Sequence, residues 1–250
     1  MPKWNLLSRW KGKSSLTKSH MGFYFVLPFF ISYFIFGMVP ILYTFLLSLQ
    51  RWDGLSDPVF VGLDNYERLL NDPMFFKSIV NTLIIWIFSI VPQVTLALAL
   101  AMILNERDIK GRHFFRAVFY FPNLVSAITL GVLFSLIFDW QTGSANKILM
   151  FLGLIDEPVN WFNSPLLSRI IVALVIMWLN FGFNMLVFIA GLQSIPREVQ
   201  EAAMIDGANR WQIATKINFP LIRPVFLFTV ITSVIGGLQL FEAPLMLGKG

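Results

Sequence analysis

The chain contains no cysteine and little charge. Asp, Glu, Lys and Arg make up 13% of its 250 residues, whereas a soluble domain usually carries about 25%. The absence of cysteine excludes disulfides, thiolate catalysis and cysteine metal sites. Its two histidines, His20 and His113, lie far apart in basic flanks, so we expect no metal site. With 56% hydrophobic residues and a mean hydropathy of +0.70, the composition indicates a membrane protein.

The chain also lacks the motifs of nucleotide binding and covalent catalysis. It has no Gly-x4-Gly-Lys-Ser/Thr loop, so binding of ATP by that route is excluded. It has no Ser/His/Asp or Cys/His set for a covalent mechanism. We therefore expect a protein that is not an enzyme and that has no cofactor of its own.

Five nearly charge-free stretches predict an all-α integral membrane fold. About 20 apolar residues in a helix cross the hydrocarbon core, and within lipid the backbone amides need internal partners. The predicted spans are residues 21–50, 78–105, 117–138, 170–196 and 224–241. The fifth becomes long enough if it continues through residue 248. The first is too long for a signal-peptide core and is interpreted as an uncleaved anchor.

Basic residues between the spans predict the orientation. Alternate segments, including residues 1–20, carry 13 Lys and Arg, whereas the intervening segments carry five. The positive-inside rule then places the N-terminus and residues 197–223 in the cytoplasm. This pattern also explains the basic pI without nucleic acid. We divide the chain into a basic cytoplasmic segment, 1–20, and one membrane domain, 21–250, with a cytoplasmic loop at 194–220.

The cytoplasmic loop is predicted to begin with a short helix. Pro196 suits the start of a helix, where a missing amide proton costs nothing. Glu198 and Glu201 lie early in this helix, where negative charge complements the helix dipole. Ala202 and Ala203 are strong helix formers whose small side chains let another surface approach closely.

A turn and a second short helix are expected to follow. Gly207 accepts a left-handed conformation, and Asp206 is predicted to cap the second helix. That helix would carry Trp211 and Ile217 and end at Phe219-Pro220. The loop is therefore predicted to be a helix–turn–helix with an acidic side chain and a small-residue knob. The other interpretation is an interfacial connector built from ordinary helix formers.

The spacing of this loop resembles a known motif. Glu201-Ala202-Ala203, Gly207 six residues after the glutamate, and Ile217-x-Phe219-Pro220 resemble the EAA loop of binding-protein-dependent ABC importers. In that family the knob enters a cleft of the ATPase, and the glutamate pairs with a basic residue there. The resemblance assigns ATPase coupling to Glu201, Ala202, Ala203, Asp206, Gly207, Ala208, Ile217 and Pro220.

The resemblance implies the transmembrane domain of a type I ABC importer, together with its partners. These are a dimer of ATPase subunits that bind ATP and magnesium, a second homologous permease, which we expect to form a heterodimer, and an extracytoplasmic solute-binding protein. The location would be a bacterial or archaeal inner membrane. Family members usually have a sixth helix after the fifth, so we expect this sequence to be truncated at its C-terminus.

Further segments resemble the carbohydrate branch of the family, such as the maltose and multiple-sugar permeases. They include Val-Gly-Leu-Asp-Asn-Tyr at 61–66, Phe121-Pro122 and Leu-Gln-Ser-Ile-Pro at 192–196. The order and spacing of these segments imply a sugar or oligosaccharide permease. Two alternatives are not excluded by the sequence. One is a permease for glycerol phosphate, a polyol or another solute, and the other is a membrane scaffold that transports nothing.

Polar residues within the spans are candidates for the substrate path, because such groups are costly in lipid unless they face a cavity or another helix. Asn180 and Asn184 are one turn apart, with Phe183 beside them. Thr232 and Gln239 share a face of the fifth span. The alternative is that these amides only join helices. Gly182, Gly236 and Gly237 are expected to let helices approach closely. An amphipathic stretch at 146–154 is interpreted as a connector.

Overall fold

The computed structural model describes residues 15–106, 109–239 and 241–247, and it divides into two compact units. These are Met1–Phe75 and Phe76–Gly250, and each is described by itself. The basic segment 1–20 lies mostly outside the described residues. The division of the chain at residue 20 stays a prediction.

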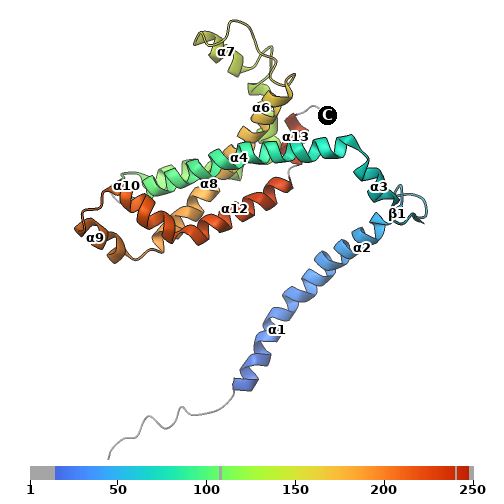
Figure 1. Ribbon diagram of the computed structural model, residues 1–250, viewed down its shortest axis with the longest axis horizontal. Coiled ribbons are helices and arrows are strands. Elements are labelled where there is room, and N and C mark those ends of the chain that lie inside the picture. The colour runs from blue at the N-terminus through green and yellow to red at the C-terminus, as the bar shows by residue number, and fades with distance from the viewer. Residues whose placement is uncertain (1–14, 107–108, 240, 248–250) are drawn as a thin grey trace, which may run out of the picture. The chain divides into compact units, whose positions relative to one another are not determined.

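The first unit contains one long apolar helix followed by a small polar module. The long helix consists of α1 (Ser15–Tyr33), a π-helical turn η1 (Phe34–Met38) and α2 (Val39–Ser48) (Figure 1). Pro40 is the second residue after the π-helical turn. Because proline has no amide proton to donate, the helix around it departs from regular α geometry. Residues Gly22–Ser48 are long and apolar enough to span a membrane, as predicted for the first stretch.

The module after α2 contains the only two strands among the described residues. β1 (Gln50–Arg51) pairs antiparallel with β2 (Val59–Phe60), and α3 (Asp64–Leu70) follows. The Asn65 side chain donates to the carbonyl oxygens of Ser48 and Gln50 at 3.0 and 2.8 Å, which fastens α3 to the end of α2. The all-α prediction is therefore right except for this short hairpin.

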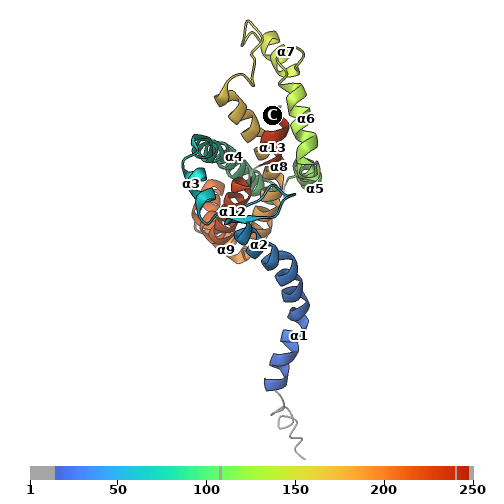
Figure 2. The same cartoon turned by 90° about the vertical axis from the view of Figure 1, so that its right-hand side faces the viewer.

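The second unit is a helical bundle. In chain order it contains α4 (Pro73–Asn105), α5 (Arg112–Tyr120), η2 (Phe121–Leu124), α6 (Ala127–Ile137), α7 (Ser144–Phe151), α8 (Pro165–Gln193), α9 (Arg197–Ile205), α10 (Arg210–Gln212), η3 (Ile213–Asn218), α11 (Phe219–Leu221), α12 (Arg223–Leu238) and α13 (Glu242–Leu247). Figures 1 and 2 show α4, α8 and α12 side by side. Their shared apolar core includes Ala97, Met185, Phe188 and Ile222.

Two spans of this unit are single long helices, as predicted. α4 has 33 residues and α8 has 29, and both are apolar enough to cross a membrane. The two other predicted spans are bent helix pairs. The segment Arg112–Leu124 meets Ala127–Ile137 at 93°, and Arg210–Leu221 meets Arg223–Leu238 at 68°. Among the described residues there are thus three unbroken candidate spans, or up to five if each bent pair forms one.

The prediction of one continuous helix over 117–138 is wrong. α5 ends at Tyr120, and the chain continues through the 3-10 turn η2, which contains Pro122. Proline lacks the amide proton and its ring crowds the preceding turn, so the α-helix cannot continue through it. Val125 and Ser126 are then extended before α6 begins at Ala127.

The prediction of a continuous fifth helix reaching residue 248 is also wrong. α12 ends at Leu238, and a separate helix, α13, begins at Glu242. Pro244 is the third residue of α13, within the first turn, where a proline is tolerated. A proline in the middle of one long helix would instead break a backbone hydrogen bond. α13 packs against α6 and α8, and its Leu247 is buried in a second apolar core.

The segment after α6 is held by one buried side chain, that of Asn146 on α7. The residue is 3% exposed. Its Nδ2 donates to the carbonyl oxygens of Trp140 and Val159, at 3.1 and 3.0 Å. Its Oδ1 accepts from the Val159 amide and from Trp161 Nε1, at 3.2 and 3.0 Å. The stretch predicted as an amphipathic connector is therefore a helix. Within residues 139–164, Asn146 joins this helix to the segments before and after it.

We expect Asn146→Leu to loosen this segment. The substitution leaves two donors and two acceptors without partners, and each buried unpaired group costs about 1–3 kcal/mol. Amide hydrogen exchange at Val159 should accelerate, and the fluorescence of Trp161 should shift to longer wavelength. Asn160→Leu is the control, because Asn160 is exposed. Unchanged exchange at Val159 in Asn146→Leu would contradict this role.

Candidate functional site

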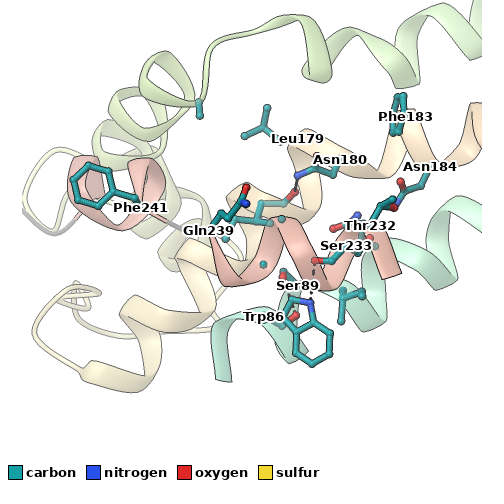
Figure 3. Close-up of a pocket in the computed structure, with 16 residues that line it drawn as sticks. Trp86, Ser89, Leu179, Asn180, Phe183, Asn184, Thr232, Ser233, Gln239 and Phe241 are labelled. Carbon is teal, nitrogen blue, oxygen red and sulfur yellow. Dashed lines mark hydrogen bonds between the residues drawn. The ribbon is translucent and has the colours of Figure 1, made fainter. Parts of the chain in front are cut away.

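A cavity of about 440 Å³ lies between α4, α8 and α12. Sixteen residues line it: Trp86, Ser89, Ile90 and Gln93 from α4; Ala127 from α6; Ile176, Leu179, Asn180, Phe183 and Asn184 from α8; Thr232, Ser233, Gly236 and Gly237 from α12; and Gln239 and Phe241 beyond it. Figure 3 shows Phe241 at one end and Phe183 with Asn184 at the other. None of the sixteen is charged.

The cavity has a buried floor and an exposed rim. We define the floor as Ser89, Gln93 and Asn184, whose exposed fractions are 2%, 5% and 5%. Phe183, Thr232 and Gln239 are exposed and form the rim. A polar group buried without a partner is unfavourable, so the floor is the part of the cavity that most needs a ligand or water.

The hydroxyl groups of Ser89 and Thr232 donate their protons to backbone carbonyl oxygens of their own helices. Ser89 Oγ donates to the Trp86 carbonyl oxygen at 2.9 Å. Thr232 Oγ1 lies 2.9 Å from the Phe228 carbonyl oxygen and 3.0 Å from that of Thr229. Each hydroxyl oxygen keeps lone pairs that can accept a hydrogen bond from a solute.

The amides supply the donors. Asn180 Nδ2 donates to the Ile176 carbonyl oxygen at 2.9 Å, while Asn184 Nδ2 has no hydrogen-bond partner among the described residues. A primary amide offers two donors and an oxygen that accepts. The cavity therefore presents donors and acceptors together with aromatic faces, and no charge from its lining residues.

Trp86 joins α4 to α12 at the cavity wall. Its Nε1 donates to the Ser233 carbonyl oxygen at 3.2 Å (Figure 3). The indole lies against Gly237, where a Cβ would stand 2.8 Å from Trp86 Cγ. The prediction that Gly237 permits close packing is thus supported. It is wrong for Gly236, where a Cβ would meet no heavy atom within 4 Å, because this glycine faces the open cavity.

The structure brings all five predicted substrate-path residues to this one cavity. Asn180, Phe183 and Asn184 come from α8, Thr232 comes from α12, and Gln239 is the residue directly after it. The α4 wall of the cavity was not predicted from the sequence; it comprises Trp86, Ser89, Ile90 and Gln93. Their spacing of three, four and seven residues is the signal that could have placed them on one helix face.

A second feature is the loop between α8 and α12, which is a helix–turn–helix as predicted. The first helix, α9, ends in a Schellman motif. The Gly207 amide donates to the Met204 carbonyl oxygen at 3.0 Å, and the Ala208 amide donates to that of Ala203 at 2.9 Å. Gly207 has φ of +83°, a left-handed conformation that glycine adopts without strain.

The prediction that Asp206 caps the second helix is wrong. Asp206 is the C-terminal cap of α9. Asn209 caps α10, because its Oδ1 accepts from the Gln212 amide at 2.9 Å while Gln212 Oε1 accepts from the Asn209 amide at 2.9 Å. The cap of this reciprocal capping box, Asn209, lies three residues after the predicted cap, Asp206.

The second helix also ends later than expected. Phe219 and Pro220 lie inside α11, and the bend into α12 comes at Ile222. Pro220 is tolerated because it occupies the first turn of α11, after the π-helical stretch η3. Gln200 Nε2 donates to Asn218 Oδ1 at 3.1 Å, which joins α9 to the second helix.

The surface of this loop is unusually apolar for a polar connector. Ile205 is 86% exposed and Trp211 is 75% exposed. Glu201 and Ala202 are exposed beside them, whereas Ala203 is buried and packs inward. A hollow of about 300 Å³ lies next to the turn and is lined by Asp206, Gly207, Ala208, Gln212, Lys216 and Ile217.

Comparison with known proteins identifies the family of the chain. Residues 82–250 match the family described as "Binding-protein-dependent transport system inner membrane component". The chain is 37% identical to the arabinooligosaccharides transport system permease protein AraP of Bacillus subtilis (strain 168), over 90% of this chain and 71% of AraP. It is 36% identical to the lactose transport system permease protein LacF of Rhizobium radiobacter, over 88% of this chain and 74% of LacF.

A solved structure has the same fold. A chain of a bacterial ABC transporter involved in the import of the acidic polysaccharide alginate superposes with a TM-score of 0.77 at 26% identity. The match covers 93% of this chain and 78% of that chain. The protein described here therefore belongs to the inner-membrane components of binding-protein-dependent transport systems, and it is a multi-pass permease subunit of an ABC transporter.

Proposed function

We propose that this chain forms part of the translocation path for a neutral sugar or oligosaccharide. The observation that supports the proposal is the uncharged polar lining of the cavity between α4, α8 and α12. A sugar needs hydrogen-bonding partners for its hydroxyls and an apolar surface for its ring faces. Asn180, Thr232 and Gln239 supply the first, and Trp86, Phe183 and Phe241 supply the second.

The absence of charge from this lining favours a neutral solute. A phosphate or carboxylate taken out of water needs a cation or several donors to compensate for its lost hydration. Neither Lys nor Arg is among the sixteen lining residues. The relatives AraP and LacF are by their names permeases for arabinooligosaccharides and lactose, which are neutral. The alginate importer handles an acidic polysaccharide, so the shared fold alone does not select the charge.

The exposed rim supports a role for a second permease subunit. Phe183, Thr232 and Gln239 line the cavity yet are exposed, so one chain leaves the cavity open on that side. A second, homologous permease packed against the rim would complete the wall. The solute would arrive from an extracytoplasmic binding protein, the partner that the family description implies.

The loop around α9 is proposed to dock the ATPase subunits. Exposed Ile205 and Trp211 offer apolar contact area in a loop that lies between two spans, and Glu201 offers a charge for a basic residue. Interfaces gain most from such buried apolar and aromatic anchors. On this proposal the N-terminus and the loop are cytoplasmic, and ATP and magnesium bind to the ATPase dimer.

Uptake by the reconstituted importer tests the proposed substrate. Proteoliposomes would contain this chain, its second permease and its ATPase, with ATP inside and the binding protein outside. We expect ATP-dependent uptake from a panel of labelled arabinotriose, lactose and trehalose. Uptake should exceed that of trigalacturonate and glycerol 3-phosphate by at least about tenfold, because an uncompensated buried charge is far more costly than a paired hydroxyl.

Other results would decide between the alternatives. Uptake of glycerol 3-phosphate or trigalacturonate alone would contradict the neutral-sugar proposal while keeping the transport function. No uptake of any solute, together with no ATPase stimulation by the loaded binding protein, would favour a membrane scaffold. The matched control is a complex whose ATPase cannot hydrolyse ATP, which should accumulate none of the solutes.

A further inference from the structure

The cavity floor is built largely from α4. Ser89 and Gln93 lie one turn apart on α4 and share a face with Trp86. Asn184 lies on α8, across from that face, and all three residues line the same cavity. Each is at least nine-tenths buried. The floor is therefore a polar cluster closed in by two helices.

The floor has a hydrogen-bonding group that the described residues do not satisfy. Asn184 Nδ2 has no partner. The Gln93 side chain is 5% exposed and lines the same cavity. Buried amides are nearly always paired, so the unpaired Asn184 Nδ2 at this cavity indicates a group that comes from outside the chain.

The cavity floor borders an apolar core. Val94 follows Gln93 and Met185 follows Asn184, and both belong to the core shared by α4, α8 and α12. If helix packing were the only requirement, leucine or alanine would serve at these positions as they do in that core. The polar side chains at this boundary therefore point to a polar ligand.

The groups that remain free match a hydroxyl. Ser89 Oγ has given its proton to the Trp86 carbonyl oxygen, so toward the cavity it can only accept. Asn184 Nδ2 can only donate, and the Gln93 amide can do both. A sugar hydroxyl donates one hydrogen bond and accepts two. Two adjacent hydroxyls on one ring would satisfy the three side chains together.

We propose that Ser89, Gln93 and Asn184 form a solute-binding subsite at the cavity floor, so that α4 contacts the transported sugar directly. The subsite binds neighbouring hydroxyls of a neutral sugar ring, while the rim residues bind the rest of the solute. This inference rests on the proposed function, and it adds a binding surface on α4 to the α8 and α12 residues named above.

Cysteine labelling tests the subsite in the assembled importer. The natural chain has no cysteine, so a single substitution introduces its only thiol. Gln93→Cys, Asn180→Cys and Lys147→Cys would each be incorporated into a complex whose other subunits lack reactive cysteines. The rate of reaction with a small charged methanethiosulfonate would be measured with and without arabinotriose, lactose or trehalose. Lys147 is exposed on α7, away from the cavity lining, and serves as the control.

Three labelling outcomes are distinguishable. Slowing by the same sugar at both Gln93→Cys and Asn180→Cys, with Lys147→Cys unchanged, supports the α4 subsite. Protection at Asn180→Cys alone, or no reaction at Gln93→Cys, overturns the subsite and leaves the proposed function standing. No protection at either position by any sugar of the panel contradicts the proposed function itself.

Transport selectivity separates binding from a structural role. Gln93→Leu should lower the preference for the transported sugar over its singly deoxygenated analogue by roughly 5- to 10-fold, the equivalent of one lost hydrogen bond. Thr95→Val, on the exposed face of α4, should leave the preference unchanged. A Gln93→Leu variant that is less stable but equally selective would show that Gln93 only supports the fold.

Discussion

Replacing Gly182 by alanine is expected to prevent α8 from packing against the α5–η2 segment. A Cβ at this position would lie 2.7 Å from the Phe119 carbonyl carbon, closer still to its oxygen, and 2.9 Å from Tyr120 Cα. These are backbone atoms, so no change of rotamer can make room. Forcing an extra carbon into a packed core costs about 1–3 kcal/mol and sometimes more. In detergent, the variant should unfold at a distinctly lower temperature or fail to accumulate.

Gly236→Ala is the matched control for this substitution. Gly236 lies in helix α12, yet a Cβ there would meet nothing within 4 Å. Alanine is favoured over glycine inside a helix by about 1 kcal/mol, so this variant should be as stable as the natural chain or slightly more so. Thermal unfolding of the purified permease complex compares the two. Equal midpoints for Gly182→Ala and the natural chain would contradict the close approach of α8 and α5.

Replacing Gly207 by proline is expected to abolish retention of the ATPase by the permease complex. Gly207 has φ of +83°, whereas proline is held near −65°. Proline also removes the amide that donates to Met204 in the Schellman motif. The chain could then no longer reverse between α9 and α10, and Glu201 and Trp211 would lose their relative positions. Affinity purification through the permease, followed by detection of the ATPase subunit, measures the loss.

Gly207→Asn is the control that separates backbone conformation from side-chain size. Asparagine accepts the left-handed region more readily than other non-glycine residues, and no atom lies within 4 Å to obstruct it. It should therefore retain most of the ATPase. If Gly207→Pro retained the ATPase as well as Gly207→Asn does, α9 would not be the docking element. If the natural complex retained none with its partner subunits present, the coupling proposal would fail altogether.

Hydropathy located the spans well but could not show where two of them bend. The apolar stretch 117–138 is continuous in sequence, yet the structure bends it by 93° after η2. Pro122 was a visible signal, but prolines also occur in α1 and α4 without ending those helices. Whether a proline breaks or only disturbs a helix depends on what the neighbouring helices pack against it. The residues near a proline in the sequence do not show which helices will pack against it.

The two halves of the candidate site differed in how far sequence could predict them. Asn180 and Thr232 stand out as polar residues in α8 and α12, and the structure places both at the cavity. Ser89 and Gln93 were overlooked because a serine or glutamine within a long apolar helix commonly bonds to its own backbone or to another helix. Only the packing of α4 against α8 shows that they face the cavity.

The sequence by itself determined the class of protein, because a shortage of charge, long apolar runs and the Glu201–Pro220 spacing are local properties of the chain. It also determined the left-handed turn at Gly207, since few residues other than glycine adopt that conformation freely. The tertiary structure alone decided which polar residues share a cavity. It also decided that Gly237 packs against another helix, whereas Gly236 faces open space. The physical reason is that helix faces buried in the bundle and helix faces exposed to lipid are composed of the same apolar residues. Only the neighbouring helices therefore distinguish a buried face from a lipid-facing one.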